Sequence, residues 1–279
     1  MLKVLKSGFY TTLQDVGRFG FRHKGVPVSG TMDDLARYRV NSLLENKTDA
    51  AVLEITMTGP TIMFETPTFI CLGGAMLSAT LNNEPIDNYH VYKVEKGDIL
   101  SYGKLEKGFR AYLGIKNGFK YKNVLQSKSQ FVPLTSHGCI MDGEGLQYLE
   151  ATSFVPKLTD FKVESYLEKG ELNVYLGPEF LFLNENQKIA LFEKSFSVSK
   201  ENNRMAYQLE EQIEKHSISM LTSATLPGTV QLTPSGKLII LMKDGQTTGG
   251  YPRVLQLTQD ALSILAQKKA GDSVRFLRN

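Results

Sequence analysis

The sequence predicts a mainly β (α+β) fold with few helices, built from barrel-like lobes. Three features of the sequence support this prediction. Short β-type runs separated by turns recur along the chain, and this spacing is typical of barrels and sandwiches. Helical periodicity is limited to three short segments. A turn-and-strand pattern at 94–103, VEKGDILSYG, is echoed at 268–277, KKAGDSVRFL, as two similar lobes would produce.

The expected strands are short apolar runs that lie between turn residues. Examples in chain order are MLKVL, VLEI, TIMF, TFICL, VYKV, DILSY, RAYLGI, LNVYL, LIILM and SVRFL. A first helix is predicted over roughly 32–45, because Thr31 and Asp34 form a capping-box pattern ahead of apolar residues at helical spacing. Two shorter helices are predicted within 184–194 and, after Thr258, near 259–267.

The chain is expected to form one domain over residues 1–279, and we consider its division into two lobes, 1–150 and 171–279. The stretch 151–170 has the weakest pattern and is where the lobe boundary is expected.

Composition excludes several classes of protein. The formal net charge is only +3, and no Lys/Arg-rich block forms a phosphate-binding stripe, so nucleic acid is not an expected partner. No apolar run approaches the ~20 residues that span a bilayer, and no signal-peptide stretch opens the chain. We therefore expect a cytoplasmic protein without membrane contact. Cys71 and Cys139 lack metal-ligand spacing and are expected to be reduced, and no metal site is expected.

A polar, glycine-rich loop at 11–34 is the first candidate for chemistry. Such loops can bring backbone close to a ligand, although a plain strand-to-helix connection explains the pattern as well. Its candidate substrate-binding and catalytic groups are Gln14, Asp15, Arg18 and Ser29.

A second polar loop, DGQTTGGYPR at 244–253, follows an apolar strand. The amide of Gln246 can both donate and accept hydrogen bonds, which suits recognition of a neutral polar group. A long hairpin turn is the alternative interpretation. The candidates here are Gln246, Thr247, Thr248 and Tyr251.

Charged residues in apolar surroundings complete the candidates. Arg110 and Arg204 could each bind a carboxylate through two parallel hydrogen bonds, or make structural pairs instead. Glu54 is a lone acid within an apolar run, and a buried carboxylate needs a partner or a raised pKa. No Walker-type ATP loop occurs, and no lysine stands between two methionines as in a biotin carrier.

Several motifs in their expected order resemble the allophanate hydrolase subunit 2 family, also called the biotin-dependent carboxyltransferase C-terminal family. They are LQDVGRFGFRHKGVPVSGTMD, AAVLEITMTGP, LGGA, FRAYLGIKNG, NNRMAYQLE, LPGTVQLTPSGK and MKDGQTTGGYPR. The chain departs from the family at Asn202, Asn203, Ala206 and Gln208 and in the turn QSKS at 126–129, but it retains Arg204 and Tyr207.

This resemblance implies a β-rich fold of cyclophilin-like barrel character. A free-standing chain of this length most resembles the members that serve in an ATP-dependent 5-oxoprolinase, which cleaves 5-oxo-L-proline to L-glutamate. The implied partners are a subunit-1-type chain, called the 5-oxoprolinase B subunit, and an A subunit of the LamB/YcsF type. ATP would be used by the complex, and no cofactor by this chain alone.

Three functional hypotheses follow. In lactam cleavage, Asp15 would accept from the ring N–H, Gln246 and Thr248 would polarise the carbonyl, and an arginine would hold the carboxylate. The enzymatic alternative is carboxyl transfer from carboxybiotin to urea or a related amide. The third is a regulatory module that binds a kinase-inhibitor-like protein, because family membership alone does not determine the reaction.

Overall fold

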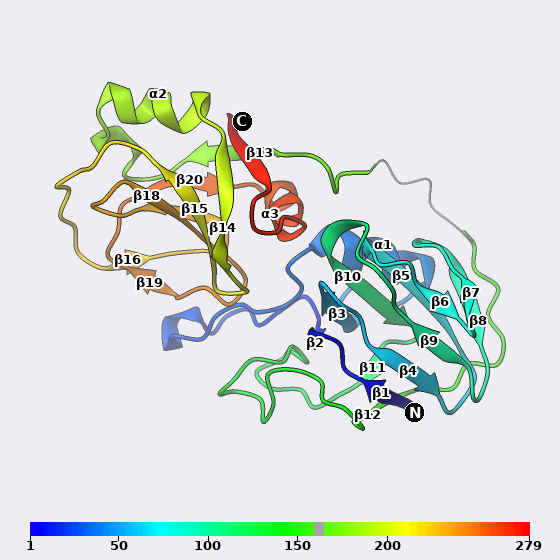
Figure 1. Cartoon of the computed structure of the whole chain (residues 1–279). Coiled ribbons are helices and arrows are strands. Elements are labelled where there is room, and N and C mark those ends of the chain that lie inside the picture. The colour runs from blue at the N-terminus through cyan, green and yellow to red at the C-terminus, as the bar shows by residue number, and fades with distance from the viewer. Residues whose placement is uncertain (159–164) are drawn as a thin grey trace. The chain divides into compact units, whose positions relative to one another are not determined.

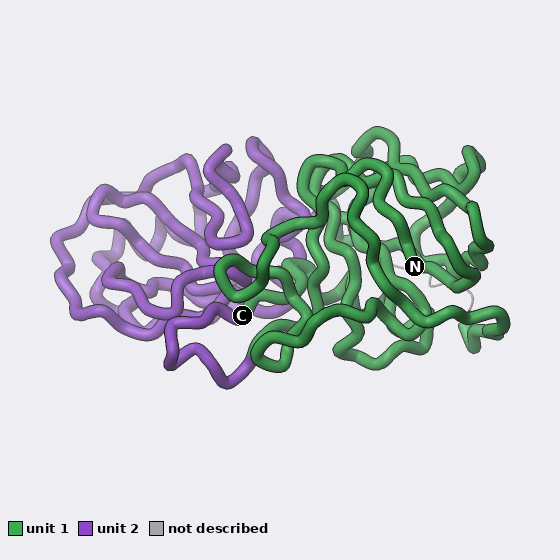
Figure 2. The backbone as a smooth tube through the Cα atoms, turned by 90° about the horizontal axis from the view of Figure 1, so that it is seen from below, with its two compact units in different colours: residues 1–18, 29–168 green, residues 19–28, 169–279 purple. Residues whose placement is uncertain are grey.

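The computed structural model describes residues 1–158 and 165–279, and these form two compact units. Unit 1 comprises Met1–Arg18 and Ser29–Glu168, and unit 2 comprises Phe19–Val28 and Lys169–Asn279 (Figure 2). The passage between them at 168 and 169 lies in the weakly patterned stretch 151–170, of which residues 159–164 are outside the described residues. The sequence did not indicate the contribution of Phe19–Val28 to unit 2.

Unit 1 contains two antiparallel sheets (Figure 1). The first has the order β11-β12-β1-β4-β9-β6-β7, with Leu2 opposite both Leu146 and Phe64. Its strands are β1 (Leu2–Lys6), β4 (Thr61–Phe64), β6 (Thr80–Leu81), β7 (Glu84–Pro85), β9 (Ile99–Ser101), β11 (Phe119–Lys120) and β12 (Gly145–Tyr148).

The second sheet has the order β2-β3-β10-β5-β8. Its strands are β2 (Tyr10–Gln14), β3 (Val52–Thr56), β5 (Thr68–Met76), β8 (Val91–Val94) and β10 (Lys107–Ile115). Glu54 on strand β3 is opposite Thr12 on one side and Tyr112 on the other. Buried side chains of both sheets, Leu13, Leu53 and Leu113 among them, form one hydrophobic cluster, while Val52 and Tyr112 of the second sheet belong to another that includes helix α1.

Helix α1 (Asp34–Leu43) packs on β5 and β10 at two glycines. A Cβ atom on Gly73 would lie 2.6 Å from Cγ2 of Val40, and one on Gly114 would also meet this valine. Only glycine therefore permits this approach. The helix was predicted, but its cap was not: Asp33 accepts from the Ala36 N–H, whereas Thr31 donates to the Asp34 side chain instead of capping the helix.

Unit 2 is a closed seven-stranded barrel with the order β13-β20-β17-β18-β15-β14-β21, closed by parallel pairing of β13 and β21 (Figure 1). Its strands are β13 (Glu171–Leu176), β14 (Phe196–Asn202), β15 (Ala206–Gln212), β17 (Thr229–Leu232), β18 (Lys237–Leu241), β20 (Arg253–Leu257) and β21 (Ser273–Arg278). A small ribbon, β16 (Ser223–Ala224) with β19 (Thr248–Gly249), lies outside the barrel order.

Both shorter helices of unit 2 are present as predicted. Helix α2 (Glu185–Glu193) begins with a capping box between Asn184 and Gln187, and α3 (Gln259–Ala266) is capped by the Thr258 hydroxyl. Two 3₁₀ turns, η1 (Arg22–Lys24) and η2 (Phe180–Phe182), complete the unit. No helix among the described residues is long and apolar enough to cross a membrane.

The predicted echo is a repeated turn. In each copy the Asp side chain accepts from the backbone N–H three residues earlier, Asp98 from Glu95 at 2.7 Å and Asp272 from Lys269 at 3.0 Å. The intervening glycines have similar left-handed φ values, 94° at Gly97 and 88° at Gly271. The mainly β prediction with few helices is confirmed, and the closed barrel lies in unit 2.

Candidate functional site

The first candidate loop is closed at its base within unit 1. The Thr31 N–H donates to the Asp15 carbonyl at 2.9 Å. Gly30 has a φ of 82°, and a Cβ atom there would lie 2.8 Å from the Gly17 nitrogen. The chain therefore leaves unit 1 and returns to it at nearly the same place, and the intervening Phe19–Val28 belongs to unit 2.

The Asp15 carboxylate holds the turn at 126–129 in place. Its Oδ1 accepts from the Gly17 N–H at 2.8 Å and from the hydroxyls of Ser127 and Ser129 at 2.7 Å each. Its Oδ2 accepts from the Lys128 N–H at 2.6 Å. These four bonds explain how a carboxylate that is 4% exposed is stabilised in the folded chain. Asp15 also lines a polar cavity of about 540 Å³ in unit 1, together with Asn46, Asn117 and Gln126 among others.

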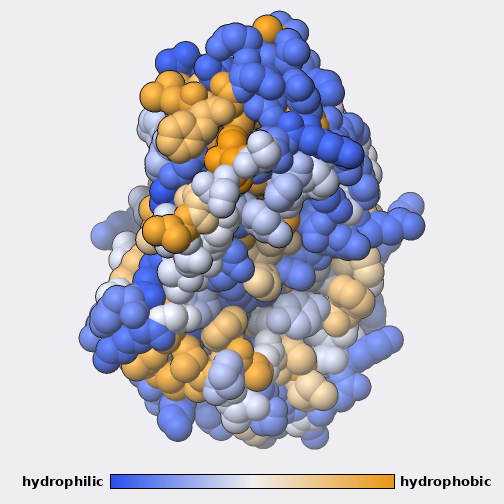
Figure 3. Space-filling model, turned by 90° about the vertical axis from the view of Figure 1, so that its left-hand side faces the viewer, coloured by the Kyte–Doolittle hydropathy of each residue, from blue (hydrophilic) through white to orange (hydrophobic). Residues whose placement is uncertain are grey.

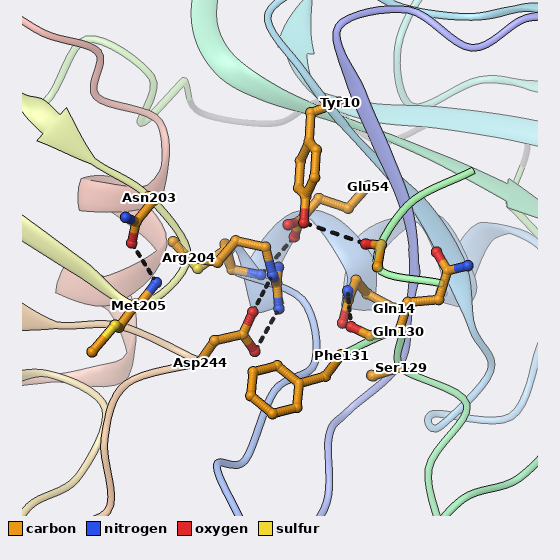
Figure 4. A network of polar contacts seen from close by, with 12 residues as sticks. Tyr10, Gln14, Glu54, Ser129, Gln130, Phe131, Asn203, Arg204, Met205 and Asp244 are labelled. Carbon is orange, nitrogen blue, oxygen red and sulfur yellow. Dashed lines mark hydrogen bonds and ion pairs between the residues drawn. The ribbon is translucent and has the colours of Figure 1, made fainter. Parts of the chain in front are cut away.

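Gln14, Arg18 and Ser29 are also fully buried. The Gln14 amide donates to the Gln130 carbonyl at 3.1 Å (Figure 4), while its Oε1 and the Ser29 hydroxyl have no partner among the described residues. Arg18 donates to the carbonyls of Val124 and Ser129. Ser29 has a φ of 55°, a conformation that non-glycine residues seldom adopt. Of these candidates, Arg18 and Asp15 both bind Ser129, whereas Gln14 binds Gln130.

Glu54 is stabilised by a separate buried network in unit 1. Its Oε2 accepts from the Met32 N–H at 2.7 Å and from the Tyr112 hydroxyl at 2.9 Å, while Arg110 Nε lies 4.0 Å from Oε1. Burial and the negative charge of Glu54 raise the pKa of Tyr112 well above its usual range, so this phenol stays protonated and donates. Glu54 and Arg110 are therefore neighbours, and each helps to neutralise the other.

In unit 2, Arg204 is engaged by an internal carboxylate. Its Nε and Nη2 lie 2.7 Å and 3.3 Å from the two Asp244 oxygens, and the Asp244 N–H donates to the Arg204 carbonyl at 2.8 Å (Figure 4). Asp244 begins the second candidate loop, so this pair anchors that loop to the turn between β14 and β15. Tyr207 is fully buried in the barrel and donates to the Lys268 carbonyl at 3.2 Å.

The second candidate loop is held by residues 223–226, which we call the brace. Thr225 donates through its hydroxyl to the Gln246 carbonyl at 2.6 Å and through its N–H to the Thr247 carbonyl at 3.0 Å. Thr248 and Gly249 form β19 and pair with β16 of the brace. These bonds fix the backbone on which three of the predicted residues lie.

The side chain of Gln246 lies close to a second amide that sequence reasoning missed. A Cβ atom on Gly249 would lie 2.9 Å from Gln246 Nε2, and it would also meet Nε2 of the buried Gln231 on β17. A polar residue in the otherwise apolar run VQL was the available signal. Tyr251 is exposed, at 42% of its surface.

A link between the two candidate loops lies inside unit 2. Arg22, in the part of the first loop that belongs to unit 2, donates through Nη2 to the Thr225 carbonyl. Thr225 in turn holds Gln246 and Thr247 of the second loop. Residues more than 200 positions apart are thus connected through one threonine, which sequence spacing does not reveal.

A second guanidinium, Arg253, supports the same brace. It donates to the Ala224 carbonyl at 2.6 Å and forms a two-point pair with Glu179, at 2.6 Å and 2.9 Å. Hydrogen bonds from Arg253 lower the pKa of Glu179, so the carboxylate stays ionised. Among the described residues, no group of three or more His, Cys, Asp or Glu side chains is arranged to hold a metal ion.

Residues 24–278 match the family described as carboxyltransferase domain, subdomain A and B. The chain is 31% identical to the C subunit of 5-oxoprolinase from Escherichia coli, over 100% of this chain and 91% of that protein. It is 29% identical to the C subunit of 5-oxoprolinase from Haemophilus influenzae, over 99% and 90% of the two chains. The urea amidolyase of Lachancea kluyveri is 27% identical over 99% of this chain, which spans only 17% of that protein.

Solved structures show the same similarity in three dimensions. The urea carboxylase of Kluyveromyces lactis superposes with a TM-score of 0.89 at 27% identity, over 99% of this chain and 27% of that chain. The K. lactis urea amidolyase superposes with a TM-score of 0.90 at 26% identity, over 99% of this chain and 18% of that one. Both relatives are therefore much longer chains, of which this fold is one part.

Proposed function

Because the chain belongs to the family of carboxyltransferase domains, subdomains A and B, we propose that it is a subunit of an ATP-dependent 5-oxoprolinase, a hydrolase that cleaves 5-oxo-L-proline to L-glutamate. The observation that carries this proposal is the nearly end-to-end match to two proteins named as the C subunit of 5-oxoprolinase, which this chain covers to 91% and 90%. The urea-processing relatives are matched over a small part of their length.

The second loop supplies groups that suit the carbonyl of a lactam. Gln246 and Thr248, with the backbone amides beside Thr247, would donate to the oxygen on which charge develops when the amide is attacked. Such donors are most effective when they are held in place before reaction. The bonds from Thr225 to the Gln246 and Thr247 carbonyls provide that rigidity. Tyr251 would contact the ligand at the edge of the loop.

Asp15 would accept a hydrogen bond from the lactam N–H through Oδ2. Each oxygen of a carboxylate offers about two lone-pair positions. Oδ1 already accepts three hydrogen bonds and Oδ2 accepts one, so Oδ2 retains capacity. The Gln14 Oε1 and the Ser29 hydroxyl, which have no partner among the described residues, are the further candidates of that loop, and Arg18 would hold the loop backbone.

The two proposed carboxylate-binding arginines are assigned different roles. Arg204 is engaged at two points by Asp244, so we assign it to anchoring the second loop. Arg110, which lies beside Glu54, stays the candidate for the substrate carboxylate, and Glu54 would then set its orientation. Tyr207, which is buried in the barrel, would have a structural role near Arg204.

The proposed complex contains a subunit-1-type partner, the 5-oxoprolinase B subunit, and an A subunit of the LamB/YcsF type, in the cytoplasm. This chain alone would bind no cofactor, and ATP would act at the other subunits or at their junction. ATP would supply the driving force by phosphorylating the amide oxygen.

A second candidate function is carboxyl transfer from carboxybiotin to urea or a related amide. The match to urea amidolyase over 99% of this chain favours it, and biotin would enter only here. An assay of the assembled subunits with ATP and either 5-oxoproline or urea plus carboxybiotin separates the two. Loss of 5-oxoproline with stoichiometric glutamate supports the lactamase proposal, and carboxylation of urea alone would replace it.

A further inference from the structure

Thr225 uses all three of its polar groups on the two candidate loops. Its N–H and hydroxyl donate to the carbonyls of Thr247 and Gln246, at 3.0 Å and 2.6 Å, and its carbonyl accepts from Arg22. Thr225 is 1% exposed, so water does not compete for these bonds. Thr225 belongs to none of the sequence motifs described above.

These bonds determine where two backbone amides point. In a planar trans peptide, the C=O and the following N–H point in opposite directions. Because the Gln246 and Thr247 carbonyls both point to Thr225, the N–H groups of Thr247 and Thr248 point away from the atoms that hold those carbonyls. Successive N–H groups on one side of a loop form a concavity that favours a negatively charged or strongly polar oxygen.

The side-chain amide of Gln246 lies in the same loop, near Gly249. Its Nε2 lies 2.9 Å from the position of a Cβ atom on Gly249, next to Thr248 in the chain. The loop therefore combines a side-chain amide with the amides of Thr247 and Thr248.

The brace is itself fixed at two consecutive carbonyls. Arg253 donates to the Ala224 carbonyl and Arg22 to the Thr225 carbonyl, so each of these two peptides is held by a guanidinium. Charge-assisted hydrogen bonds of this kind are stronger than those between neutral groups. Arg253 is in turn fixed by Glu179. Movement of Thr225 would require several of these bonds to break together.

We propose that Thr225 is a positioning residue that orients the amides of Thr247 and Thr248 toward the substrate carbonyl oxygen, and that Arg22 fixes Thr225 from the first loop. That the two amides bind a substrate carbonyl oxygen rests on the lactamase function proposed above. Their orientation by Thr225 does not rest on it. Through this bond of Arg22, the backbone conformation of the second candidate loop depends on a residue of the first candidate loop.

The orientation is tested on the full chain without catalysis. Thr225→Val removes only the hydroxyl donor, Thr225→Ser retains it, and Thr233→Val removes a hydroxyl from the turn at 233–237. NMR relaxation reports the order of the Thr247 and Thr248 N–H vectors, with order parameters of about 0.85 in rigid backbone and below about 0.6 in flexible backbone. We expect low values in Thr225→Val and rigid values in Thr225→Ser and Thr233→Val.

Arg22→Gln provides a second route if Thr225→Val does not fold, because it leaves the threonine intact. It should lower the same two order parameters to a smaller degree. Unchanged order parameters in the folded Thr225→Val or Arg22→Gln chain would overturn the positioning role, whatever the complex does with 5-oxoproline.

The catalytic consequence is measured in the assembled complex. Thr225→Val should lower kcat by about tenfold or more with little change in KM, because misplaced donors affect the transition state most. Thr225→Ser should restore kcat. A fall in order parameters without a fall in kcat would show that the two amides do not serve the reaction. Failure of the complex to cleave 5-oxoproline at all would instead contradict the proposed function, and the NMR result would stand.

Discussion

Arg204 and Asp244 form a two-point ion pair in unit 2, with Nε 2.7 Å from Oδ2 and both side chains largely buried, at 7% and 12% exposed. The pair connects the turn after β14 to the first residue of the 244–253 loop, 40 positions later in the chain. An arginine that looked suited to a substrate carboxylate is thus paired within the protein, and its removal leaves a buried carboxylate without this partner.

Arg204→Ala is therefore expected to lower the free energy of unfolding by about 3 kcal/mol, as is usual when one member of a buried pair is removed. Urea denaturation followed by circular dichroism measures this. The control is Arg275→Ala, which breaks the exposed pair with Glu171 and should cost less than about 1 kcal/mol. Equal losses in the two variants would show that the Arg204 pair has no special role in stability.

Asp15→Asn tests whether the carboxylate organises the turn at 126–129. The amide nitrogen of asparagine cannot accept the hydrogen bonds that one carboxylate oxygen now receives, so backbone amides of that turn should exchange faster with deuterium. We expect at least about tenfold faster exchange at Lys128, since its N–H is bonded to Oδ2. Unchanged exchange there would remove Asp15 from this role. Glu144→Gln, at a different turn, is the control.

The Glu179–Arg253 pair predicts a dependence of stability on acid pH. Its hydrogen bonds lower the pKa of Glu179 in the folded chain below the ordinary value of about 4.3 for an unfolded glutamate. The stabilisation is therefore complete above about pH 4.3 and is lost as pH falls through the lowered folded value. Thermal unfolding of the wild type and Glu179→Gln should differ at about pH 6, and the difference should shrink as pH falls below about 4.3.

Glu171→Gln, in the exposed pair with Arg275, is the control and should show a much smaller difference at about pH 6. A gap between wild type and Glu179→Gln that stays constant from about pH 6 to about pH 3 would contradict the assignment.

The proposed assembly predicts that an apolar surface of this chain is covered by the subunit-1-type partner. Figure 3 shows apolar side chains exposed among polar ones, and in unit 2 Leu181 and Phe182 of η2 and Ile189 of α2 are 79%, 65% and 50% exposed. We expect Phe182→Ser to weaken binding of the partner in pull-down and calorimetry, with Tyr38→Ser, an exposed residue on α1, as the control. Unaltered binding by Phe182→Ser would place the interface elsewhere.

The ten strand runs that we named and all three helices could be predicted from sequence because their signals are local, whereas β2, β14, β15, β17 and β20 were not among the named runs. Apolar runs such as TFICL and LIILM fold as strands, and the Thr258 cap begins α3 as its side chain indicates. The predicted cap of α1 was wrong, because the Thr31 hydroxyl donates to the Asp34 side chain and Asp33 accepts the Ala36 N–H in its place.

The candidate site could be predicted less well, because its partners are distant in the chain. The polar residues of the 244–253 loop pointed to Gln246 and Thr247. Thr225, which holds both, lies just before the motif LPGTVQLTPSGK and was not itself part of any motif. No local pattern indicated that Phe19–Val28 would belong to unit 2, since that depends on contacts such as that of Arg22 with Thr225. Expected burial made Glu54 a candidate, and the structure shows that it lies beside Arg110.

We propose that the 244–253 loop of this chain donates hydrogen bonds to the lactam, and that 5-oxoproline is cleaved only when the three subunits are assembled. Wild-type chain and Gln246→Ala should each assemble with the A and B subunits, as size-exclusion chromatography can verify. Glutamate and ADP release from 5-oxoproline and ATP are then measured for the isolated chain, the wild-type complex and the Gln246→Ala complex. Gln256→Ala, at a glutamine of β20 outside the loop, serves as the control.

We predict no turnover by the isolated chain, coupled release of glutamate and ADP by the wild-type complex, and a loss of about 10² in the rate with Gln246→Ala, as for a lost transition-state donor. Lactam cleavage by the isolated chain, or full activity of the Gln246→Ala complex, would contradict the account.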